Sequence, residues 1–175
     1  MNNRLKIIKG DITKLKVDAI VNTADSSLLG GGGIDGDIHK AAGPELLKEC
    51  LKLGGCCTGN VKITKGYMLP AKYIIHAVGP IWRGGAKGES KLLCSCYEET
   101  FNVALKNNIK TIAIPAISCG IYGYPTKQAA NIAIKETTNF LELHDEIQSI
   151  FFVCYNESIY EAFENALNTI AGQYA

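Results

Sequence analysis

The sequence predicts an α/β fold with a mostly parallel sheet covered by helices on both faces. Short apolar segments typical of buried strands alternate with longer segments in which apolar residues recur at helical spacing. Two glycine loops, at residues 30–36 and 118–123, each follow a predicted strand and precede a predicted helix. Alternating strands and helices build a parallel sheet with helices packed on it, so these patterns predict such a sheet over most of the chain.

Glycine, proline and apolar spacing set the boundaries of the elements. The apolar run at 18–22 is typical of a strand buried on both faces. Gly43 and Pro44 divide one helical pattern in two, and Pro125 opens a helix, where proline is tolerated. Strands are expected at residues 4–9, 18–22, 61–64, 73–78, 111–115 and 149–155, with residues 67–69 pairing nearby. Helices are expected at residues 37–42, 44–53, 92–107, 125–141 and 158–170, with a short helical turn at 12–16.

The composition predicts one domain over residues 1–175, because this length gives a full core and no linker or repeat divides it. Hydrophobic residues make up 47% and charged residues 20% of the chain, the ordinary balance of a globular protein. With 18 Lys and Arg against 17 Asp and Glu, the net charge of +1 argues against a nucleic-acid binder, which would carry a basic stripe. We expect a monomer.

The seven cysteines predict reduced thiols in a cytoplasmic protein. Their number is odd, Cys94 and Cys96 lack zinc spacing, and no second Cys or His pair completes a tetrahedral site. No apolar run reaches the length of a membrane span, and the first residues lack the apolar core of a signal peptide. We therefore expect no metal, no cofactor and no membrane partner.

The first glycine loop is the strongest local signal for a ligand. It places five glycines in the seven residues 30–36, between a predicted strand and a predicted helix. Glycine lets the main chain approach an anion closely, and the free N–H groups at a helix start favour negative charge. Asp35, the acid within this loop, would lie beside a bound phosphoester, which makes it the first candidate for chemistry.

The second glycine loop, at 118–123, ends another strand of the predicted sheet. Ligands of such sheets bind at the carboxyl ends of the strands, where residues 10–11 and 155–156 also lie. Two loops that each open a helix suit a diphosphate, although they could also be ordinary tight connections. Neither loop has the spacing of a dinucleotide or P-loop fingerprint.

Four residues have more than one interpretation, and a fifth, His76, has one. Asp11 could accept from the amine of adenine, or could cap a turn, which the sequence alone favours. Tyr155 could stack on a base or fill the rim of the sheet. Tyr122 could cover a sugar ring or pack within its loop. His39 could be catalytic, but we interpret it as a helix residue with a local hydrogen bond. We interpret His76 as a core residue of its strand.

Taken together, these segments make the chain resemble the macro domain family, and within it the MacroD-type branch that processes ADP-ribose. The resemblance covers nearly the whole chain, and the glycine loop with its Ile-Asp-Gly end is the most specific part. The matching segments are residues 10–13, 17–22, 27–36, 38–44, 69–72 and 117–125.

The resemblance implies a three-layer α/β/α fold with a mixed, mostly parallel sheet, and a ligand that is ADP-ribose or an ADP-ribosylated protein. Members of this branch remove mono-ADP-ribose from acidic side chains and deacetylate O-acetyl-ADP-ribose. Asp35 matches the family's catalytic acid, which would orient or deprotonate a water. The implied substrate-binding residues are Asp11 and Ile12 at the adenine, Tyr155 and Asn156 at the near ribose, Gly31, Gly32, Gly33, Ile34, Ser118, Cys119, Gly120, Ile121 and Tyr122 at the diphosphate, and Asn22.

Residues 22–25 depart from the family pattern. The family usually reads Asn-Ala-Ala-Asn, and this chain reads Asn-Thr-Ala-Asp. The family's second asparagine touches the distal ribose beside the reacting carbon, so the resemblance places Asp25 with Asp35 in the catalytic site. An ionised carboxylate only accepts hydrogen bonds, and it adds negative charge beside the diphosphate, so we expect reduced activity. Cys119 stands where the family often has threonine, which should matter less because that loop binds through its backbone.

Two function classes are consistent with the sequence. The first is a hydrolase acting on ester-linked ADP-ribose, which Asp35 favours. The second is a module that binds ADP-ribose with little or no turnover, which Asp25 favours.

Overall fold

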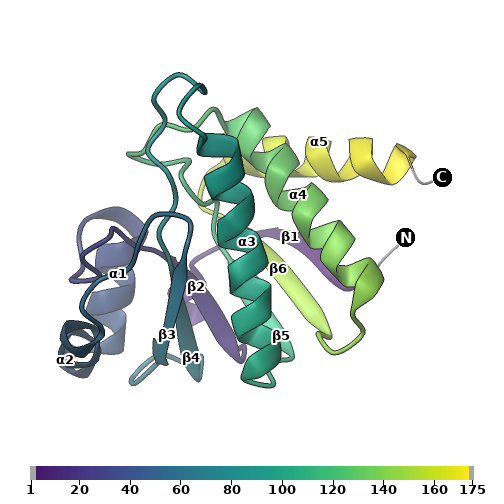
Figure 1. Cartoon of the computed structure of the whole chain (residues 1–175). Helices are drawn as coiled ribbons and strands as arrows, with labels where there is room; N and C mark the ends of the chain where they lie inside the picture. The colour runs from purple at the N-terminus through teal and green to yellow at the C-terminus, as the bar shows by residue number, and fades with distance from the viewer. Residues whose placement is uncertain (1–2, 174–175) are drawn as a thin grey trace.

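One sheet runs through the part of the chain that the computed structural model describes, residues 3–173. Its six strands lie in the order β1-β6-β5-β2-β4-β3 (Figure 1), and neighbouring strands are parallel except for β3 with β4, at one edge. The mixed, mostly parallel sheet predicted from the sequence is confirmed. The strands are β1 (Leu5–Lys9), β2 (Ala19–Thr23), β3 (Val61–Lys65), β4 (Tyr73–Ala77), β5 (Thr111–Ile114) and β6 (Ser149–Cys154).

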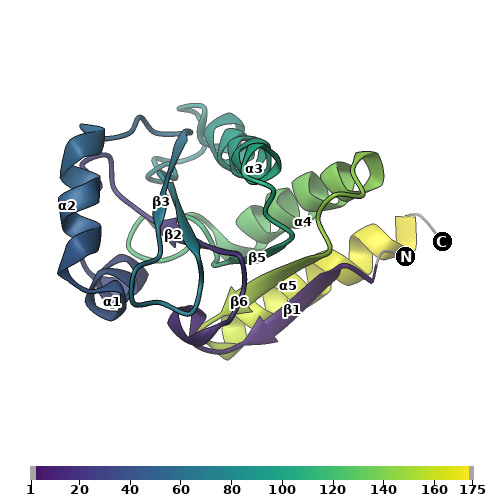
Figure 2. The ribbon, with the colours of Figure 1, turned by 90° about the horizontal axis from the view of Figure 1, so that it is seen from below.

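Helices cover both faces of this sheet. α1 (Gly33–Ala42) and α2 (Pro44–Leu53) pack on one face. α3 (Glu89–Lys106), α4 (Thr126–Leu143) and α5 (Glu157–Gln173) pack in the core of the other face. Figure 2 shows α1 and α2 apart from α3 and α4, with β2 and β3 between them. The three-layer α/β/α fold is therefore confirmed. Within residues 3–173, no helix combines the length and apolarity that crossing a membrane requires.

β2 lies between the two cores, which explains why its first three residues are apolar. Ile20 packs in the core beneath α1 and α2, whereas Ala19 and Val21 pack in the core beneath α3 and α4. All three side chains are buried. Apolar burial contributes roughly 25 cal/mol per Å² removed from water, so a strand used on both faces is strongly fixed in the sheet. The loop after β2 therefore begins at a defined place.

The start of α1 differs from the sequence prediction. The helix begins at Gly33 rather than at residue 37, and the N–H of Gly36 donates to the carbonyl of Gly32 at 3.3 Å. A Cβ on Gly36 would lie 2.4 Å from the carbonyl oxygen of Gly31, so this close turn requires glycine. Glycine disfavours the helical conformation and has no side chain, so Gly33 and Gly36 give no sequence pattern that predicts the first turn of α1. As a result Asp35 belongs to the helix and not to the loop.

Residues 67–69, expected to pair beside the sheet, form a turn instead. The N–H of Leu69 donates to the carbonyl of Gly66 at 3.0 Å. Tyr67 has φ of +52°, in the left-handed region that an extended strand does not use. This prediction was wrong because an apolar Tyr-Met-Leu run reads like a strand when its turn geometry is not visible.

α3 begins at Glu89, before the expected start at residue 92. The buried carboxylate of Glu89 accepts from the N–H groups of Arg83, Gly85 and Lys87, at 2.9, 2.8 and 2.6 Å. These bonds hold the preceding loop in place, and they lower the pKa of Glu89 to about 2 despite its burial.

Candidate functional site

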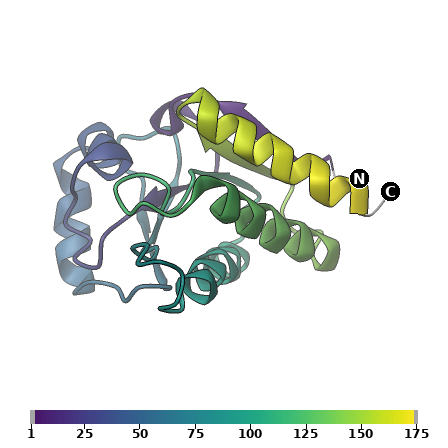
Figure 3. The same cartoon turned by 90° about the horizontal axis from the view of Figure 1, so that it is seen from above.

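The carboxyl ends of four neighbouring strands bring the predicted site residues to one edge of the sheet. β1, β6, β5 and β2 are adjacent and parallel, so their carboxyl ends point the same way. Asp11 follows β1, Tyr155 follows β6, the loop with Ser118 follows β5, and Asp25 follows β2. In the view of Figure 3, the green loop that leads into α4 lies between α4 and α1. The convergence expected from the sequence is thus present, with Asp11 and Asp25 at opposite ends of the row.

Asp35 lies in the first turn of α1 with its side chain directed inward, and only 5% of the residue is exposed. Its Oδ1 accepts a hydrogen bond of 2.8 Å from Nδ2 of Asn22 on β2. Nε2 of His39, one turn further along α1, lies 3.5 Å from the same oxygen. Oδ2 faces the glycine loop, because a Cβ built on Gly31 would lie 3.4 Å from it. One carboxylate oxygen is therefore held by Asn22, and the other lies beside Gly31 of the glycine loop.

The environment of Asp35 favours its protonated form. Burial raises the pKa of Asp35 above its ordinary value, and the negative charge of Asp25 acts in the same direction. The hydrogen bond from Asn22 and the charge of His39 oppose this rise in pKa. A carboxylate with a raised pKa accepts a proton more readily, which is the property that a general base needs.

A chain of buried polar groups extends from Asp35 into the sheet. Nδ2 of Asn22 also lies 3.1 Å from Nδ1 of His76, and Nε2 of His76 lies 2.9 Å from Oγ1 of Thr64. All four residues are buried. Burial lowers the pKa of His76 to about 3, so its ring is neutral near neutral pH. His76 is a core residue, as the sequence predicts, but it also contacts a residue of the site.

Several polar atoms around Asp35 are buried without a hydrogen-bond partner. Among the described residues these atoms include Oδ1 of Asn22 and Nε2 of His39, whose side chains both contact Asp35. Oγ of Ser118, after β5, is also buried without a partner. An unpaired buried polar group costs roughly 1–3 kcal/mol. The two unpaired atoms on the side chains that contact Asp35 mark a position where a polar ligand would be favourable.

Asp25 lies in the loop that follows β2, where its carboxylate is bonded within its own turn. Oδ1 accepts from the N–H of Ser27 at 2.9 Å and from the Ser27 hydroxyl. Burial is the main cause of the raised pKa of Asp35 and of Tyr122, and the negative charge of Asp25 acts in the same direction on both. The structure therefore brings the two predicted catalytic acids close enough to interact.

The first glycine loop presents exposed main chain at the start of α1. Gly31, Gly32 and Gly33 are exposed, while Ile34 is half-buried. Gly33 has φ of +59°, in the left-handed region that favours glycine. No atom lies within 4 Å of a Cβ built on Gly32 or Gly33, so the space beside both is open. This arrangement suits an anion at the N-terminus of a helix.

The second glycine loop is held by bonds at both of its ends. The N–H of Tyr124 donates to the carbonyl of Ser118 at 2.9 Å, and the N–H of Trp82 donates to the carbonyl of Tyr122 at 2.8 Å. Ser118 has φ of +67°, although it is not glycine. Between these anchors Gly120 is exposed, and Ile121 is 93% exposed. Cys119 is half-buried, and burial raises its pKa to about 12, so its thiol is not reactive.

At the β1 and β6 end of the row of strands, Asp11 caps a short helix and the side chain of Tyr155 is exposed. Oδ1 of Asp11 accepts from the N–H of Thr13 at 3.0 Å and from its hydroxyl at 2.7 Å, which caps the short helix η1 (Ile12–Lys14). These bonds lower the pKa of Asp11, so it is ionised near neutral pH. Tyr155 is 56% exposed, so its ring does not fill the rim of the sheet. Oδ1 of Asn156 accepts from the N–H of Ile159 at 2.8 Å, at the start of α5.

The sequence contained a signal that pairs His39 with Asp35 on the same helix. Residues 35 and 39 are four apart, and side chains at that spacing meet on a helix. No local signal pairs Asn22 with His76, since this contact arises from the parallel register of β2 and β4.

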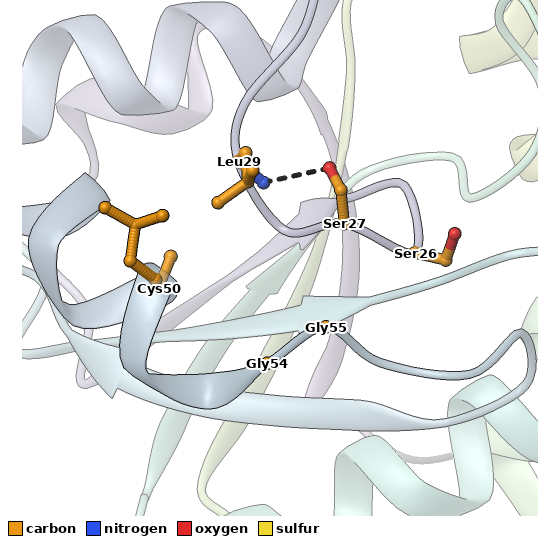
Figure 4. A pocket seen from close by; sticks show the side chains of 7 residues that line it. Ser26, Ser27, Leu29, Cys50, Gly54 and Gly55 are labelled. Carbon is orange, nitrogen blue, oxygen red and sulfur yellow. Dashed lines mark hydrogen bonds between the residues drawn. The ribbon is translucent and has the colours of Figure 1, made fainter.

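Hollows in the surface lie next to the site rather than over it. One of about 340 Å³ lies between α2 and the loop after β2, where the N–H of Leu29 donates to Oγ of Ser27 at 3.2 Å (Figure 4). A second, of about 640 Å³, shares Ser26, Gly54 and Gly55 with it and continues to β3. None of the predicted site residues lines either hollow. Within residues 3–173, no group of three or more His, Cys, Asp or Glu side chains is arranged to hold a metal ion.

Comparison with known proteins identifies the family. The macro domain model matches residues 21–133. An O-acetyl-ADP-ribose deacetylase of Citrobacter rodentium is 48% identical over 95% of this chain and 97% of its own length. The ADP-ribose glycohydrolase MACROD2 of Xenopus laevis is 52% identical over 94% of this chain and 40% of its own length. A Trypanosoma brucei macrodomain, solved in complex with ADP-ribose, superposes with a TM-score of 0.88 at 42% identity, covering 94% of this chain and 69% of that one. With this similarity along nearly its whole length, the chain belongs to the macro domain family.

Proposed function

We propose that this chain binds ADP-ribose and hydrolyses ADP-ribosyl esters. Its substrates would be proteins that carry mono-ADP-ribose on acidic side chains, and O-acetyl-ADP-ribose. Relatives named as a deacetylase and as a glycohydrolase of ADP-ribose support this chemistry, and the macrodomain solved with ADP-ribose supports the ligand.

The sheet order supports a path for the ligand along the row of strand ends. Adenine would lie by Asp11 and Ile12, below the exposed ring of Tyr155. The diphosphate would follow between the two glycine loops. The distal ribose would then lie beside Asp25 and Asp35, after β2.

The observation that carries the enzymatic proposal is the geometry of Asp35. Its Oδ1 is held by Asn22, while Oδ2 faces the glycine loop at Gly31. A water between Oδ2 and the ribose ester would be oriented for attack. In an ADP-ribosylated acidic side chain, the water oxygen would bond to the ribose carbon that bears the ester oxygen while its proton passes to Oδ2. The bond from that carbon to the ester oxygen would break, and the side-chain carboxylate would leave with the electron pair. In O-acetyl-ADP-ribose the water oxygen would bond to the acetyl carbonyl carbon instead, and the ribose oxygen would leave as a hydroxyl by taking the proton back from Asp35.

Asp25 supports the alternative, a binding module with weak turnover. Its oxygens cannot donate to a ribose hydroxyl when ionised, and its negative charge would lie beside the diphosphate. A module of this kind would bind ADP-ribose and release little product.

One pair of measurements separates these functions. Release of ADP-ribose from a mono-ADP-ribosylated protein would be measured alongside calorimetric titration with free ADP-ribose. We expect both turnover and binding, and Asp35→Ala should lose most turnover, roughly 10²- to 10⁴-fold, while binding persists. Binding without turnover by the unsubstituted chain would establish the module, and absence of binding would refute both.

A further inference from the structure

We propose that His76 is a positioning residue for Asp35, acting through the side-chain amide of Asn22. Its expected effect on turnover rests on the proposed function, whereas its effect on the Asp35 carboxyl does not. The inference rests on the direction of each hydrogen bond in the buried chain that joins these residues to Thr64.

The register of the sheet creates this chain of contacts. Asn22 on β2 lies opposite His76 on the parallel strand β4. His76 in turn lies opposite Lys62 of the antiparallel strand β3, and the hydroxyl of Thr64 on that strand lies 2.9 Å from Nε2 of His76. Three neighbouring strands therefore contribute one residue each to the support of a carboxylate on α1.

The donors and acceptors of this chain have one consistent assignment. Asp35 is an acceptor when ionised, so Asn22 must direct Nδ2 toward it. The second hydrogen of Nδ2 then points to Nδ1 of His76, which must accept and so carries no proton. A neutral His76 consequently carries its proton on Nε2 and donates it to Oγ1 of Thr64. The Thr64 hydroxyl donates in turn to the carbonyl of Lys65, at 3.2 Å.

This assignment fixes the orientation of the Asn22 amide. If the amide turned over, its Oδ1 would face both the carboxylate of Asp35 and the lone pair of His76 Nδ1. Both contacts would be repulsive, and in a buried position no water relieves them. His76 thus keeps a donor directed at Oδ1 of Asp35, which leaves Oδ2 toward the glycine loop.

Charged and titratable groups around the chain do not replace this support. Asp35 is faced by His39 on its own helix, by Asp25 after β2, by Cys50 of α2 and by Tyr122 of the second glycine loop. His76 is faced by His39, with ring centroids 6.4 Å apart. Within the described structure, only Asn22 donates a hydrogen bond to the buried Asp35 carboxylate.

The test uses Thr64→Val, which keeps the shape of the side chain and removes only its hydroxyl. This hydroxyl lies at the end of the hydrogen-bonded chain farthest from Asp35. Thr64→Val leaves the Nε2–H of His76 without an acceptor, which favours the tautomer protonated at Nδ1. The proton on Nδ1 would point at the amide nitrogen of Asn22 and displace this nitrogen from Asp35. Thr64→Ser is the matched control, because it retains the hydroxyl.

The first readout is the titration of the Asp35 carboxyl followed by NMR in the ligand-free protein. In Thr64→Val its pKa should rise relative to the unsubstituted chain and to Thr64→Ser, because the ionised form loses its donor. The imidazole nitrogen signals of His76 should report a proton at Nε2 in the unsubstituted chain and in Thr64→Ser. Identical Asp35 titrations in Thr64→Val and Thr64→Ser would overturn the inference, whether or not the chain is an enzyme.

The second readout is turnover. Thr64→Val should lower kcat by about tenfold, the change that one hydrogen bond to a charged group typically gives, with little change in KM. An active chain whose Thr64→Val variant kept full kcat would contradict the inference, and an inactive unsubstituted chain would refute the proposed function alone.

A second pair of variants covers the case in which Thr64→Val does not fold. His76→Asn places an amide oxygen near the position of Nδ1 and so retains an acceptor for Asn22. His76→Gln places its amide near Nε2 and leaves Asn22 without that acceptor. The Asp35 carboxyl should titrate higher in His76→Gln than in His76→Asn, and equal titrations would contradict the inference.

Discussion

Asn22 and Asp35 join β2 to α1 through a buried hydrogen bond of 2.8 Å from Nδ2 to Oδ1. This bond stabilises the ionised carboxylate, yet burial outweighs it, and the pKa of Asp35 lies above its ordinary value. The fold therefore maintains a carboxylate in a position where its charge is unfavourable. Such a conflict between stability and charge is typical of groups that perform chemistry.

The same conflict predicts that Asp35→Asn stabilises the protein near neutral pH. Because the pKa of Asp35 is raised in the folded protein, the folded state holds this proton at pH values where the unfolded chain has lost it. The free energy of unfolding contributed by Asp35 consequently falls as pH rises from the ordinary pKa of aspartate to the raised one. Asparagine cannot titrate and can still accept from Asn22.

Thermal unfolding of the two proteins at several pH values would check this prediction. We expect a higher Tm for Asp35→Asn near neutral pH, and no such gain in acid below the ordinary aspartate value, where Asp35 is protonated in both states. A Tm difference that grew toward acid pH would contradict the prediction.

The fold was predictable from the sequence, because alternating strand and helix patterns leave few arrangements for a chain of this length. The three consecutive apolar residues 19–21 predicted a strand buried on both faces, and the structure places them between two cores. The start of α1 was missed because Gly33 and Gly36 carry no side chains from which a helical pattern could be recognised. The turn at 67–69 was missed because an apolar run does not reveal its backbone angles.

The site was predictable where it depends on residue type, and not where it depends on register. The glycine loop with its acid indicated Asp35, and an acid after a strand indicated the cap that Asp11 forms. The contact of Asn22 with His76 joins residues 54 positions apart and exists only because β2 and β4 pair in one register. No local pattern carries that information.

Gly32→Glu should abolish ADP-ribose binding while the fold survives. No atom lies within 4 Å of a Cβ at this position, so the new side chain does not collide with the protein. Its negative charge would instead oppose the diphosphate at the start of α1. Gly32→Gln is the matched control for size without charge. Calorimetry should show a larger loss of affinity for Gly32→Glu than for Gly32→Gln, and unfolding curves should be similar for both. Normal binding by a folded Gly32→Glu would show that the diphosphate lies elsewhere.

Asp11→Asn should separate the two interpretations of this acid. The amide oxygen can still accept from Thr13, so the cap of η1 and the Tm should persist. The amide nitrogen, however, would present a donor to the amine of adenine, where the carboxylate accepts. We expect a loss of ADP-ribose affinity of ~1–3 kcal/mol, as for a hydrogen bond to a charged group. If calorimetry gave equal affinities, Asp11 would act only as a cap.

Asp25→Asn tests the position at which this chain differs from its family. The negative charge of Asp25 raises the pKa of Asp35, so removing it should lower that pKa. If ionised Asp35 is the base, the acid limb of kcat/KM should move to lower pH in Asp25→Asn. Near neutral pH the variant should also be faster, because an amide can donate to a ribose hydroxyl and does not repel the diphosphate.

The bond between Asp25 and Ser27 provides the control for this experiment. An asparagine oxygen can still accept from the N–H of Ser27, so the turn after β2 should persist in Asp25→Asn. Asp25→Ala removes the charge and also the acceptor, and should be less stable without a new donor. Faster turnover by Asp25→Asn than by Asp25→Ala would therefore assign the gain to the amide, whereas equal rates would assign it to loss of the charge. If kcat/KM of Asp25→Asn coincided with that of the unsubstituted chain at every pH, Asp25 would not face the reacting ribose, and its bonds to Ser27 would describe its whole role.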